Sequence, residues 1–141
     1  MLKEFSFGFG DKEVTINLPQ ERVINVVEGK PVLPVTDVEA AVKEALNKPI
    51  GTPPLKEVVQ LGDKVVIIAS DITRKWARHD LFLPTLLNEL NAAGIPDVDV
   101  SLIVALGAHR HHTHEENILT FGQEIVDRIT ILQSYAPEEN D

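Results

Sequence analysis

The sequence contains no cysteine, only one methionine and one tryptophan, and few aromatic residues, at 5% of the chain. Without cysteine, the protein can form no disulfide and can use no thiolate as a nucleophile or metal ligand. Clusters of lysine and arginine are also missing, and 22 acidic against 13 basic residues give a net charge of −9. This charge argues against binding to the phosphate backbone of nucleic acids.

Long apolar runs are absent as well. The run from Val65 to Ala69 falls far short of the roughly 20 residues that cross a bilayer, so we expect no membrane span. The N-terminus carries an acid at Glu4 and has no basic region that leads into an apolar stretch. We therefore expect no signal peptide and a cytoplasmic location. With 43% hydrophobic and 25% charged residues over 141 positions, the composition is that of an ordered domain with its own core.

Residues 1–34 are predicted to form a small antiparallel β unit. Apolar and polar residues alternate over residues 3–18 on both sides of Gly10, a pattern typical of a β-hairpin. The β-branched run from Arg22 to Val27 predicts a third short strand.

Residues 35–141 are predicted to form a βαβ core. A first helix is expected from Thr36 or Asp37. Strands over residues 64–70 and 97–106 have continuous apolar stretches, which are typical of strands buried on both faces. The remaining elements are a helix over 80–93, a capped helix from Thr113, a short helical segment over 123–126, a strand over 129–132 and a polar tail over 134–141. We therefore predict an α/β fold: a mainly parallel sheet with flanking helices, preceded by the antiparallel unit.

The loop after the strand over residues 64–70 is the first candidate site. It holds Asp71, Thr73 and three basic residues that include Arg74, at the strand end where open α/β sheets bind ligands. Arg74 can hold a carboxylate or phosphate in a bidentate fork. The alternative is structural, with Asp71 capping the turn and the cations in solvent. Trp76 is expected to pack in the fold, and a pocket-lining role is the alternative.

The loop after the strand over residues 97–106 holds four of the five histidines within six residues: His109, His111, His112 and His114. His109 is the candidate general acid/base, because it is nearest to the strand end and Gly107 lets it approach a ligand closely. Metal binding by His112 with His114, or by His109 with His111, is a second interpretation. A solvated polar turn is the third.

Together the two loops resemble the N-terminal domain of the nickel-dependent lactate racemase family. The resemblance rests on Asp71-x-Thr73-Arg74 and Gly107-x-His109-Arg110 at successive strand ends, followed by Thr113-x-Glu115-Glu116, and it covers most of the chain. It implies part of a two-domain enzyme that inverts the stereocentre of a 2-hydroxy acid with a nickel pincer nucleotide. In such enzymes a histidine takes the hydroxyl proton, while the hydride goes to the cofactor ring and returns on the opposite face.

By this resemblance, His109 would be one of two acid/base histidines and Arg74 would hold an anionic group of the substrate or cofactor. Asp71 and Thr73 would line the cofactor pocket. No metal ligand is expected in this chain, because the family's nickel-binding histidine, cofactor lysine and second acid/base histidine lie beyond the point where it stops. Residues 1–141 would then be the family's N-terminal domain, either as a fragment of a longer enzyme or as a stand-alone domain that has lost or delegated the chemistry.

The chain departs from the family pattern at three places. Lys75 and His111 stand where the family usually has proline, so the substrate can differ from lactate. Ser134-Tyr135 stand in place of a His-Asp pair. The leading hypothesis is the catalytic N-terminal half of such an enzyme, with a small anionic 2-hydroxy acid as substrate and a missing C-terminal domain as partner. The alternatives are a non-catalytic anion-binding module, a histidine-rich metal-binding module, and a scaffold that completes an oligomer.

Overall fold

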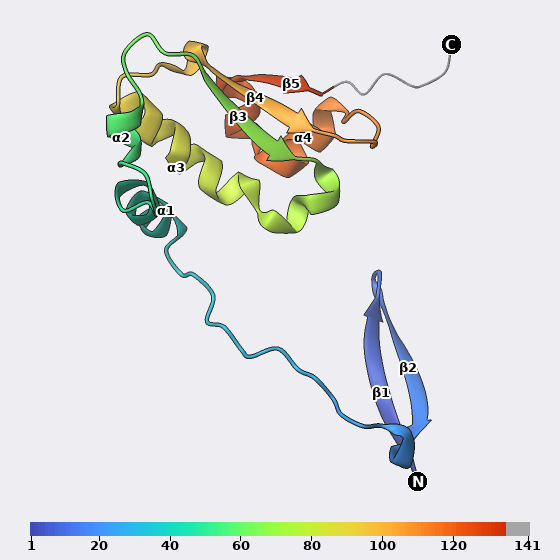
Figure 1. The fold of residues 1–141 in the computed structure, drawn as a ribbon. Helices are drawn as coiled ribbons and strands as arrows, with labels where there is room; N and C mark the ends of the chain where they lie inside the picture. The colour runs from blue at the N-terminus through green and yellow to red at the C-terminus, as the bar shows by residue number, and fades with distance from the viewer. Residues whose placement is uncertain (135–141) are drawn as a thin grey trace. The chain divides into compact units, whose positions relative to one another are not determined.

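The computed structural model describes residues 1–134, so all of the predicted tail over residues 134–141 except Ser134 lies outside it, Tyr135 included. The chain divides into two compact units, Met1–Pro34 and Val35–Asp141 (Figure 1). The first unit consists of strands β1 (Leu2–Phe9) and β2 (Lys12–Pro19) and a 3₁₀ turn, η1 (Gln20–Arg22).

The predicted hairpin is confirmed, and its register follows from the alternation of side chains. Phe5 pairs with Ile16 and Phe7 pairs with Val14, so these apolar side chains share one face of the ribbon. Gly10 has a φ of +60°, which supplies the positive φ that a two-residue hairpin turn needs at its first position.

The predicted third strand over residues 22–27 is wrong. Residues 23–35 have no regular secondary structure, and the side chains of Ile24 and Val27 are 102% and 91% exposed. β-branched residues favour an extended backbone, but a strand also needs a neighbouring strand to exchange hydrogen bonds with it. Within residues 1–134 this segment pairs with no strand.

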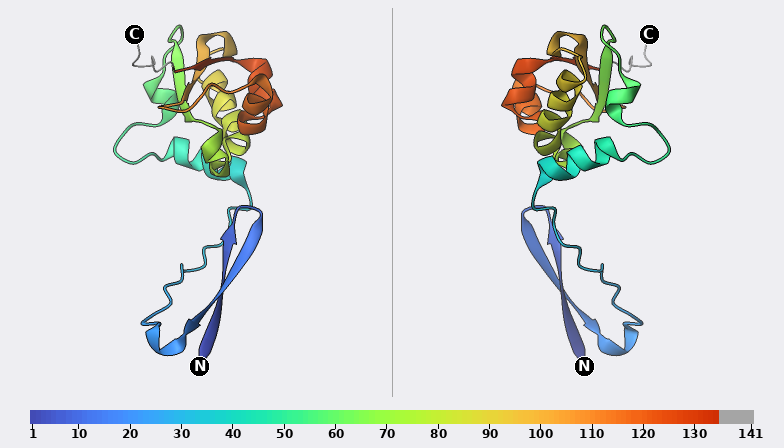
Figure 2. Two further views of the ribbon diagram at one scale, coloured as in Figure 1. Left: turned by 90° about the vertical axis from the view of Figure 1, so that its right-hand side faces the viewer. Right: turned by 90° about the vertical axis from the view of Figure 1, so that its left-hand side faces the viewer.

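The second unit contains a three-stranded parallel sheet in the order β3-β4-β5, and it confirms the predicted α/β fold (Figures 1 and 2). Its strands are β3 (Val65–Ser70), β4 (Val100–Ala105) and β5 (Thr130–Gln133). Its helical segments are α1 (Val38–Asn47), α2 (Leu55–Val58), η2 (Ile72–Ala77), α3 (His79–Ala92), η3 (Asp97–Asp99), α4 (His114–Phe121) and α5 (Gln123–Arg128). None of the helices in the described part of the chain has both the length and the apolar character to cross a membrane.

The predicted helix starts are also confirmed, because local sequence sets them. The carboxylate of Asp37 accepts a hydrogen bond of 2.9 Å from the Ala40 N–H at the start of α1. Thr113 and Glu116 form a reciprocal capping box at the start of α4. Gly94 follows α3 with a φ of +97°, the left-handed conformation in which helices often end.

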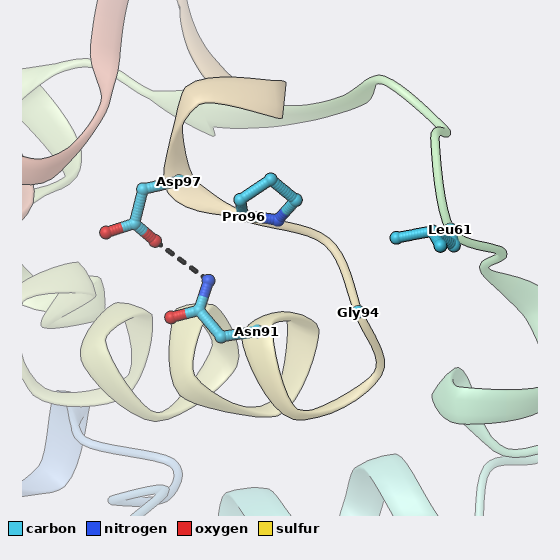
Figure 3. A pocket seen from close by; sticks show the side chains of 5 residues that line it. All are labelled: Leu61, Asn91, Gly94, Pro96 and Asp97. Atoms are coloured by element: carbon cyan, nitrogen blue, oxygen red, sulfur yellow. Dashed lines mark hydrogen bonds between the residues drawn. The ribbon is translucent and has the colours of Figure 1, made fainter.

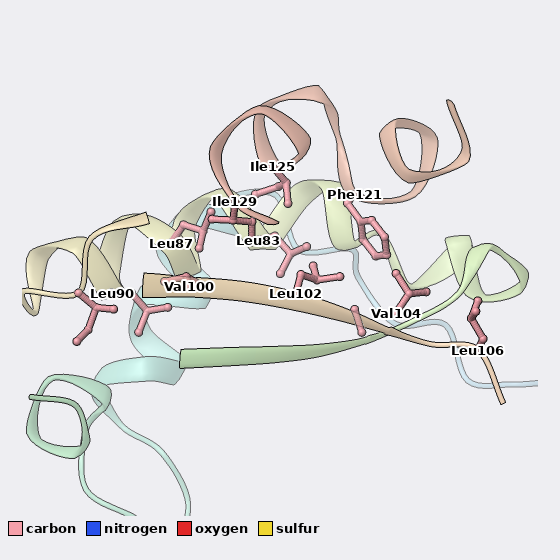
Figure 4. Packing of buried hydrophobic residues seen from close by; sticks show 12 residues of the cluster. Leu83, Leu87, Leu90, Val100, Leu102, Val104, Leu106, Phe121, Ile125 and Ile129 are labelled. Atoms are coloured by element: carbon pink, nitrogen blue, oxygen red, sulfur yellow. The ribbon is translucent and has the colours of Figure 1, made fainter. Parts of the chain in front are cut away.

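The core lies between one face of the sheet and helices α3, α4 and α5 (Figure 4). The stripe of leucines predicted for α3 faces this core, and β4 contributes alternate residues from the other side. Side chains that are at most 2% exposed include Leu83, Leu87, Leu90, Val100, Leu102, Val104, Phe121 and Ile125.

The opposite face of the sheet is open, which corrects the prediction that both strands are buried on both faces. The parallel register places Ile68, Ile103 and Leu132 side by side on this face. Ile68 is 73% exposed and Leu132 is 48% exposed. Continuous apolar runs are typical of sheets with helices on both sides. Here the helices among residues 1–134 leave the second face uncovered.

The difference between the two faces predicts the cost of a valine-to-threonine substitution, which preserves side-chain shape and β-branching. Val104 is 0% exposed, so Val104→Thr should lower the free energy of unfolding by about 1–3 kcal/mol, because it buries a hydroxyl. Val66 is 54% exposed, and Val66→Thr should change it by less than about 0.5 kcal/mol. Urea denaturation of the two variants tests this. If Val66→Thr lowers the free energy of unfolding as much as is expected for Val104→Thr, both faces of the sheet are covered.

Candidate functional site

The two predicted loops meet at the carboxyl end of the sheet. Parallel pairing places Ser70, the last residue of β3, beside Ala105, the last residue of β4. Asp71 therefore leaves the sheet next to the turn that leads to His109. The loops are joined at two points, one at Asp71 and one at His112.

Asp71 is buried, with 3% of its surface exposed, and its two carboxylate oxygens have different partners. Oδ1 accepts hydrogen bonds from the Thr73 N–H at 3.2 Å and from the Thr73 hydroxyl at 2.6 Å. Oδ2 contacts Nδ1 of His109. Burial opposes the charged carboxylate, but the bonds from Thr73 and His109 together outweigh it and lower the pKa of Asp71. Asp71 is therefore an anion at neutral pH.

His109 is presented by a tight turn after β4. Gly107 has a φ of +60°, and the His109 N–H donates to the Leu106 carbonyl at 3.0 Å. The His109 side chain is 55% exposed and turns Nδ1 toward Asp71. Because Asp71 is ionised, Nδ1 carries the proton in the neutral form of the ring, and in that form Nε2 has the free lone pair. A carboxylate that fixes the tautomer of an accessible histidine is a common arrangement for a general base.

His112 joins the loops at the second point. Its side chain is buried, and Nε2 accepts a hydrogen bond of 2.8 Å from the Ile72 N–H. Nδ1 lies 3.0 Å from Oδ1 of Asn117. Both ring nitrogens are therefore occupied, so a metal site built from His112 and His114 does not fit. Among residues 1–134, no three His, Cys, Asp or Glu side chains are grouped in a way that could hold a metal ion.

Arg110 has a structural partner. Its guanidinium donates to both carboxylate oxygens of Glu116, at 2.8 and 2.7 Å. Glu116 also accepts from the Thr113 N–H at 2.9 Å. The Arg110 bond, followed by the Thr113 bond, lowers the pKa of Glu116 to about 2. This pair ties the histidine loop to the start of α4.

Arg74 and Lys75 are the cations of the first loop that are left available for an anion, and of the two Arg74 can bind a carboxylate in a bidentate fork. Arg78 binds both carboxylate oxygens of Asp80, at 2.9 and 2.8 Å. The Arg74 N–H donates to the Asp71 carbonyl at 2.9 Å, but the Arg74 side chain is exposed and makes no hydrogen bond or ion pair with another residue of the described range 1–134. It lies at a break within η2, where its φ and ψ are −111° and 27°.

The expectation that Trp76 packs in the fold is wrong, because its side chain is 76% exposed. It lies on the rim of an apolar groove of about 540 Å³ that α1 forms with η2 and α3. Val38 and Ala41 line the groove from α1, and Phe82 lines it from α3.

A second hollow, of about 580 Å³, lies at the opposite end of the sheet (Figure 3). Most of its lining residues come just before β4 in the sequence, so it lies at the end of the strands away from Asp71 and His109. Its lining residues are Leu61, Asn91, Gly94, Pro96 and Asp97, and Asn91 donates to Asp97 at 2.9 Å.

The fifth histidine, His79, lies outside the site at the start of α3. It is 7% exposed, and its ring centroid lies 5.5 Å from that of Phe82 and 5.7 Å from that of Phe121. Nδ1 is buried without a hydrogen-bond partner among the described residues. Burial lowers the pKa of His79, although Asp80 opposes the effect.

This environment predicts how stability depends on pH. Because the pKa of His79 is lower in the folded chain, the unfolded chain takes up the proton first as the pH falls through 6.5. The free energy of unfolding should therefore decrease from pH 7.5 to pH 5.5, and His79→Leu should lose part of that decrease. Urea denaturation at both pH values, with exposed His114→Leu as the control, measures the difference. Equal pH dependence in the wild type and His79→Leu would contradict it.

Three structural partners in this region were not predicted from the sequence. Gln133 in β5 binds the main chain of His112, Asn117 binds its ring, and the Ser134 hydroxyl accepts from the Leu106 N–H at 2.9 Å. Gln133 and Ser134 are 21 and 28 residues away in sequence from the residues that they bind, and no local pattern marks them or Asn117 as partners.

Comparison with known proteins identifies the family. The family model described as the lactate racemase N-terminal domain matches residues 9–141. Lactate racemase of Lactiplantibacillus plantarum is 33% identical over 102 residues, which are 72% of this chain and 24% of that protein. Lactate racemase of Thermoanaerobacterium thermosaccharolyticum is 31% identical over 121 residues, which are 84% of this chain and 28% of that protein. The chain thus spans about a quarter of the length of these curated relatives.

A solved structure agrees with the sequence matches. The lactate racemase apoprotein from T. thermosaccharolyticum superposes with a TM-score of 0.76 and 29% sequence identity, over 94% of this chain and 30% of that one. The resemblance carried by the two loops is therefore confirmed. This chain belongs to the lactate racemase N-terminal domain family.

Proposed function

We propose that this chain is the N-terminal catalytic part of an isomerase that racemises or epimerises a 2-hydroxy acid. The observation that carries the proposal is the contact between Asp71 and His109 at the ends of neighbouring strands, in a chain of this family. A 2-hydroxy acid presents a hydroxyl and a carboxylate. An oriented histidine and an unpaired arginine match these two groups.

In this mechanism His109 moves the hydroxyl proton. Asp71 accepts a hydrogen bond from Nδ1–H of His109, so Nε2 is free to take the proton of the substrate hydroxyl while the C–O bond of the substrate gains carbonyl character. His109 returns this proton to the oxygen when the hydroxyl forms again. Thr73 fixes the Asp71 carboxylate with two hydrogen bonds, so the imidazole keeps one orientation. Arg74 binds the substrate carboxylate or an anionic group of the cofactor.

This chain offers only some of the groups that would bind a nickel pincer nucleotide. Arg74 and Thr73 offer a cation and a hydroxyl suited to an anionic group of the nucleotide. The described residues 1–134 hold no grouping of His, Cys, Asp or Glu suited to a metal. When bound, the group would accept and return the hydride of the substrate. We place the nickel ligand, the attachment lysine and the second acid/base histidine in a C-terminal domain, and the enzyme in the cytoplasm.

The test is an enantiomer assay. A full-length polypeptide that contains this chain, loaded with cofactor, should interconvert D- and L-lactate or a related 2-hydroxy acid. If no 2-hydroxy acid is inverted while the 141-residue chain still binds L-lactate at Arg74, the chain is an anion-binding module and the enzymatic proposal fails.

The role of Arg74 has its own test. Arg74→Gln removes one charge-assisted carboxylate contact, worth about 1.5–3 kcal/mol, and should weaken L-lactate binding about 10- to 100-fold. Lys75→Gln, which removes the same charge from the next exposed position, should change it less than about threefold. NMR titration of the chain compares the two variants, and equal weakening would assign the effect to general charge.

A further inference from the structure

We propose that His112 is a positioning residue whose neutral ring fixes the distance between the Asp71 loop and the His109 loop. The inference rests on the proposed function for its catalytic consequence, because it concerns the same site. The contacts that carry it lie in this chain alone. It also gives His112, which the sequence offered only as a metal ligand, a role in geometry beside the role of His109 in chemistry.

The first step is the protonation state of the His112 ring. Nε2 accepts from the Ile72 N–H, so it carries no proton. Nδ1 faces the Asn117 side-chain oxygen, which only accepts, so Nδ1 carries the proton. One neutral tautomer satisfies both contacts, and neither the other tautomer nor the cation does.

The second step is that two elements, β5 and α4, hold this residue in place. From β5, the side chain of Gln133 accepts from the His112 N–H at 2.7 Å and donates to its carbonyl at 3.1 Å. From α4, Phe121 stacks on the ring, with centroids 6.2 Å apart and an angle of 29°. The ring itself is 7% exposed. His112 is therefore a fixed point, and the Ile72 amide is bound to it.

The third step connects this fixed point to the site. Ile72 directly follows Asp71, and His112 lies three residues after His109, so the Ile72–His112 bond runs beside the Asp71–His109 contact. Asp71 has no side-chain bond to the fixed elements α4 and β5. The bond from Ile72 to His112 supplies that link. It holds the carboxylate at the position where Oδ2 meets Nδ1 of His109.

The test uses NMR of the 141-residue chain without substrate or cofactor. His112→Phe keeps an aromatic ring against Phe121 but removes both hydrogen bonds. Hydrogen-exchange protection of the Ile72 amide should fall about five- to tenfold. The ¹⁵N shifts of His109 should move from the Nδ1–H tautomer toward a mixture of tautomers. His114→Phe, in the same loop but exposed, should leave both signals unchanged.

A conservative variant separates positioning from space filling. In His112→Gln the amide oxygen reaches the position of Nε2 and accepts from Ile72, so the Ile72 protection and the His109 shifts should be restored. Asn117→Leu removes the partner of His112 Nδ1 and should also move the ¹⁵N shifts of His109 toward a mixture of tautomers. This variant keeps the test available if His112→Phe does not fold.

The proposal is overturned if a folded His112→Phe or Asn117→Leu chain keeps the wild-type His109 shifts and Ile72 protection. These readouts need no racemase activity. A lack of racemase activity would therefore contradict the proposed function but would not contradict this inference. In an active full-length polypeptide, His112→Phe should lower kcat more than it raises KM, because Arg74 still binds the carboxylate.

Discussion

A His109→Ala variant of a full-length polypeptide that contains this chain is expected to lose racemisation by about 10²–10⁴-fold. In the proposed mechanism His109 moves the hydroxyl proton, and removing such a group costs a factor of about this size in general acid–base catalysis. The His109 side chain is 55% exposed, so its removal leaves no large cavity in the core. Thermal unfolding of the variant should therefore stay close to wild type while the enantiomer assay falls.

The control is a second histidine of the same loop. His114 is exposed at the first position of α4, and His114→Ala should keep activity within about threefold of wild type. If His109→Ala keeps activity at that level too, the acid/base role belongs elsewhere in the enzyme. If both variants lose activity equally, the loss reports on the loop as a whole.

Sequence predicts the elements of this fold where the signals are local. The Thr113 capping box and the left-handed Gly94 lie within one turn of the helix ends that they define. The order of strands and helices follows from apolar periodicity in the same way. These features need no information about distant parts of the chain.

Sequence fails where a partner is required. Residues 22–27 have the composition of a strand, but a strand exists only where another one pairs with it. Val66 and Ile68 have the composition of a doubly covered strand, yet burial depends on which layers are present. The composition of a segment shows which structures it can adopt. Which one it adopts depends on the other segments of the protein that pack against it or pair with it.

The site shows the same division. Asp71, Thr73 and His109 are predictable because parallel strands bring their carboxyl ends to one edge of the sheet. The contacts of His112 are not predictable, since its partners Ile72 and Gln133 are 40 and 21 residues away in sequence. Neither is the use of Arg110, which the sequence leaves as one more loop cation and the structure binds to Glu116.

An Asp71→Asn variant is expected to leave His109 in place but reverse its tautomer. The amide oxygen can still accept from Thr73, which puts the amide NH₂ group toward Nδ1 of His109. Nδ1 must then accept, so the proton moves to Nε2 and the basic nitrogen is lost. Racemisation should fall by about 10²–10⁴-fold, the size of effect known when the carboxylate behind a catalytic histidine becomes an amide. The ¹⁵N shifts of His109 in the chain alone should show the reversed tautomer.

Acid denaturation gives a second readout for this variant. The pKa of Asp71 lies below 3.8 in the folded chain, so its ionised form contributes stability above that pH and loses it as the pH falls further. Asp71→Asn should therefore be less stable than wild type at pH 7 and lose less on going to pH 3. Asp80→Asn, which breaks an exposed pair with Arg78, is the matched control and should leave the His109 tautomer and the activity unchanged. If Asp71→Asn keeps the Nδ1–H tautomer and full activity, Asp71 only caps η2 and does not act through His109.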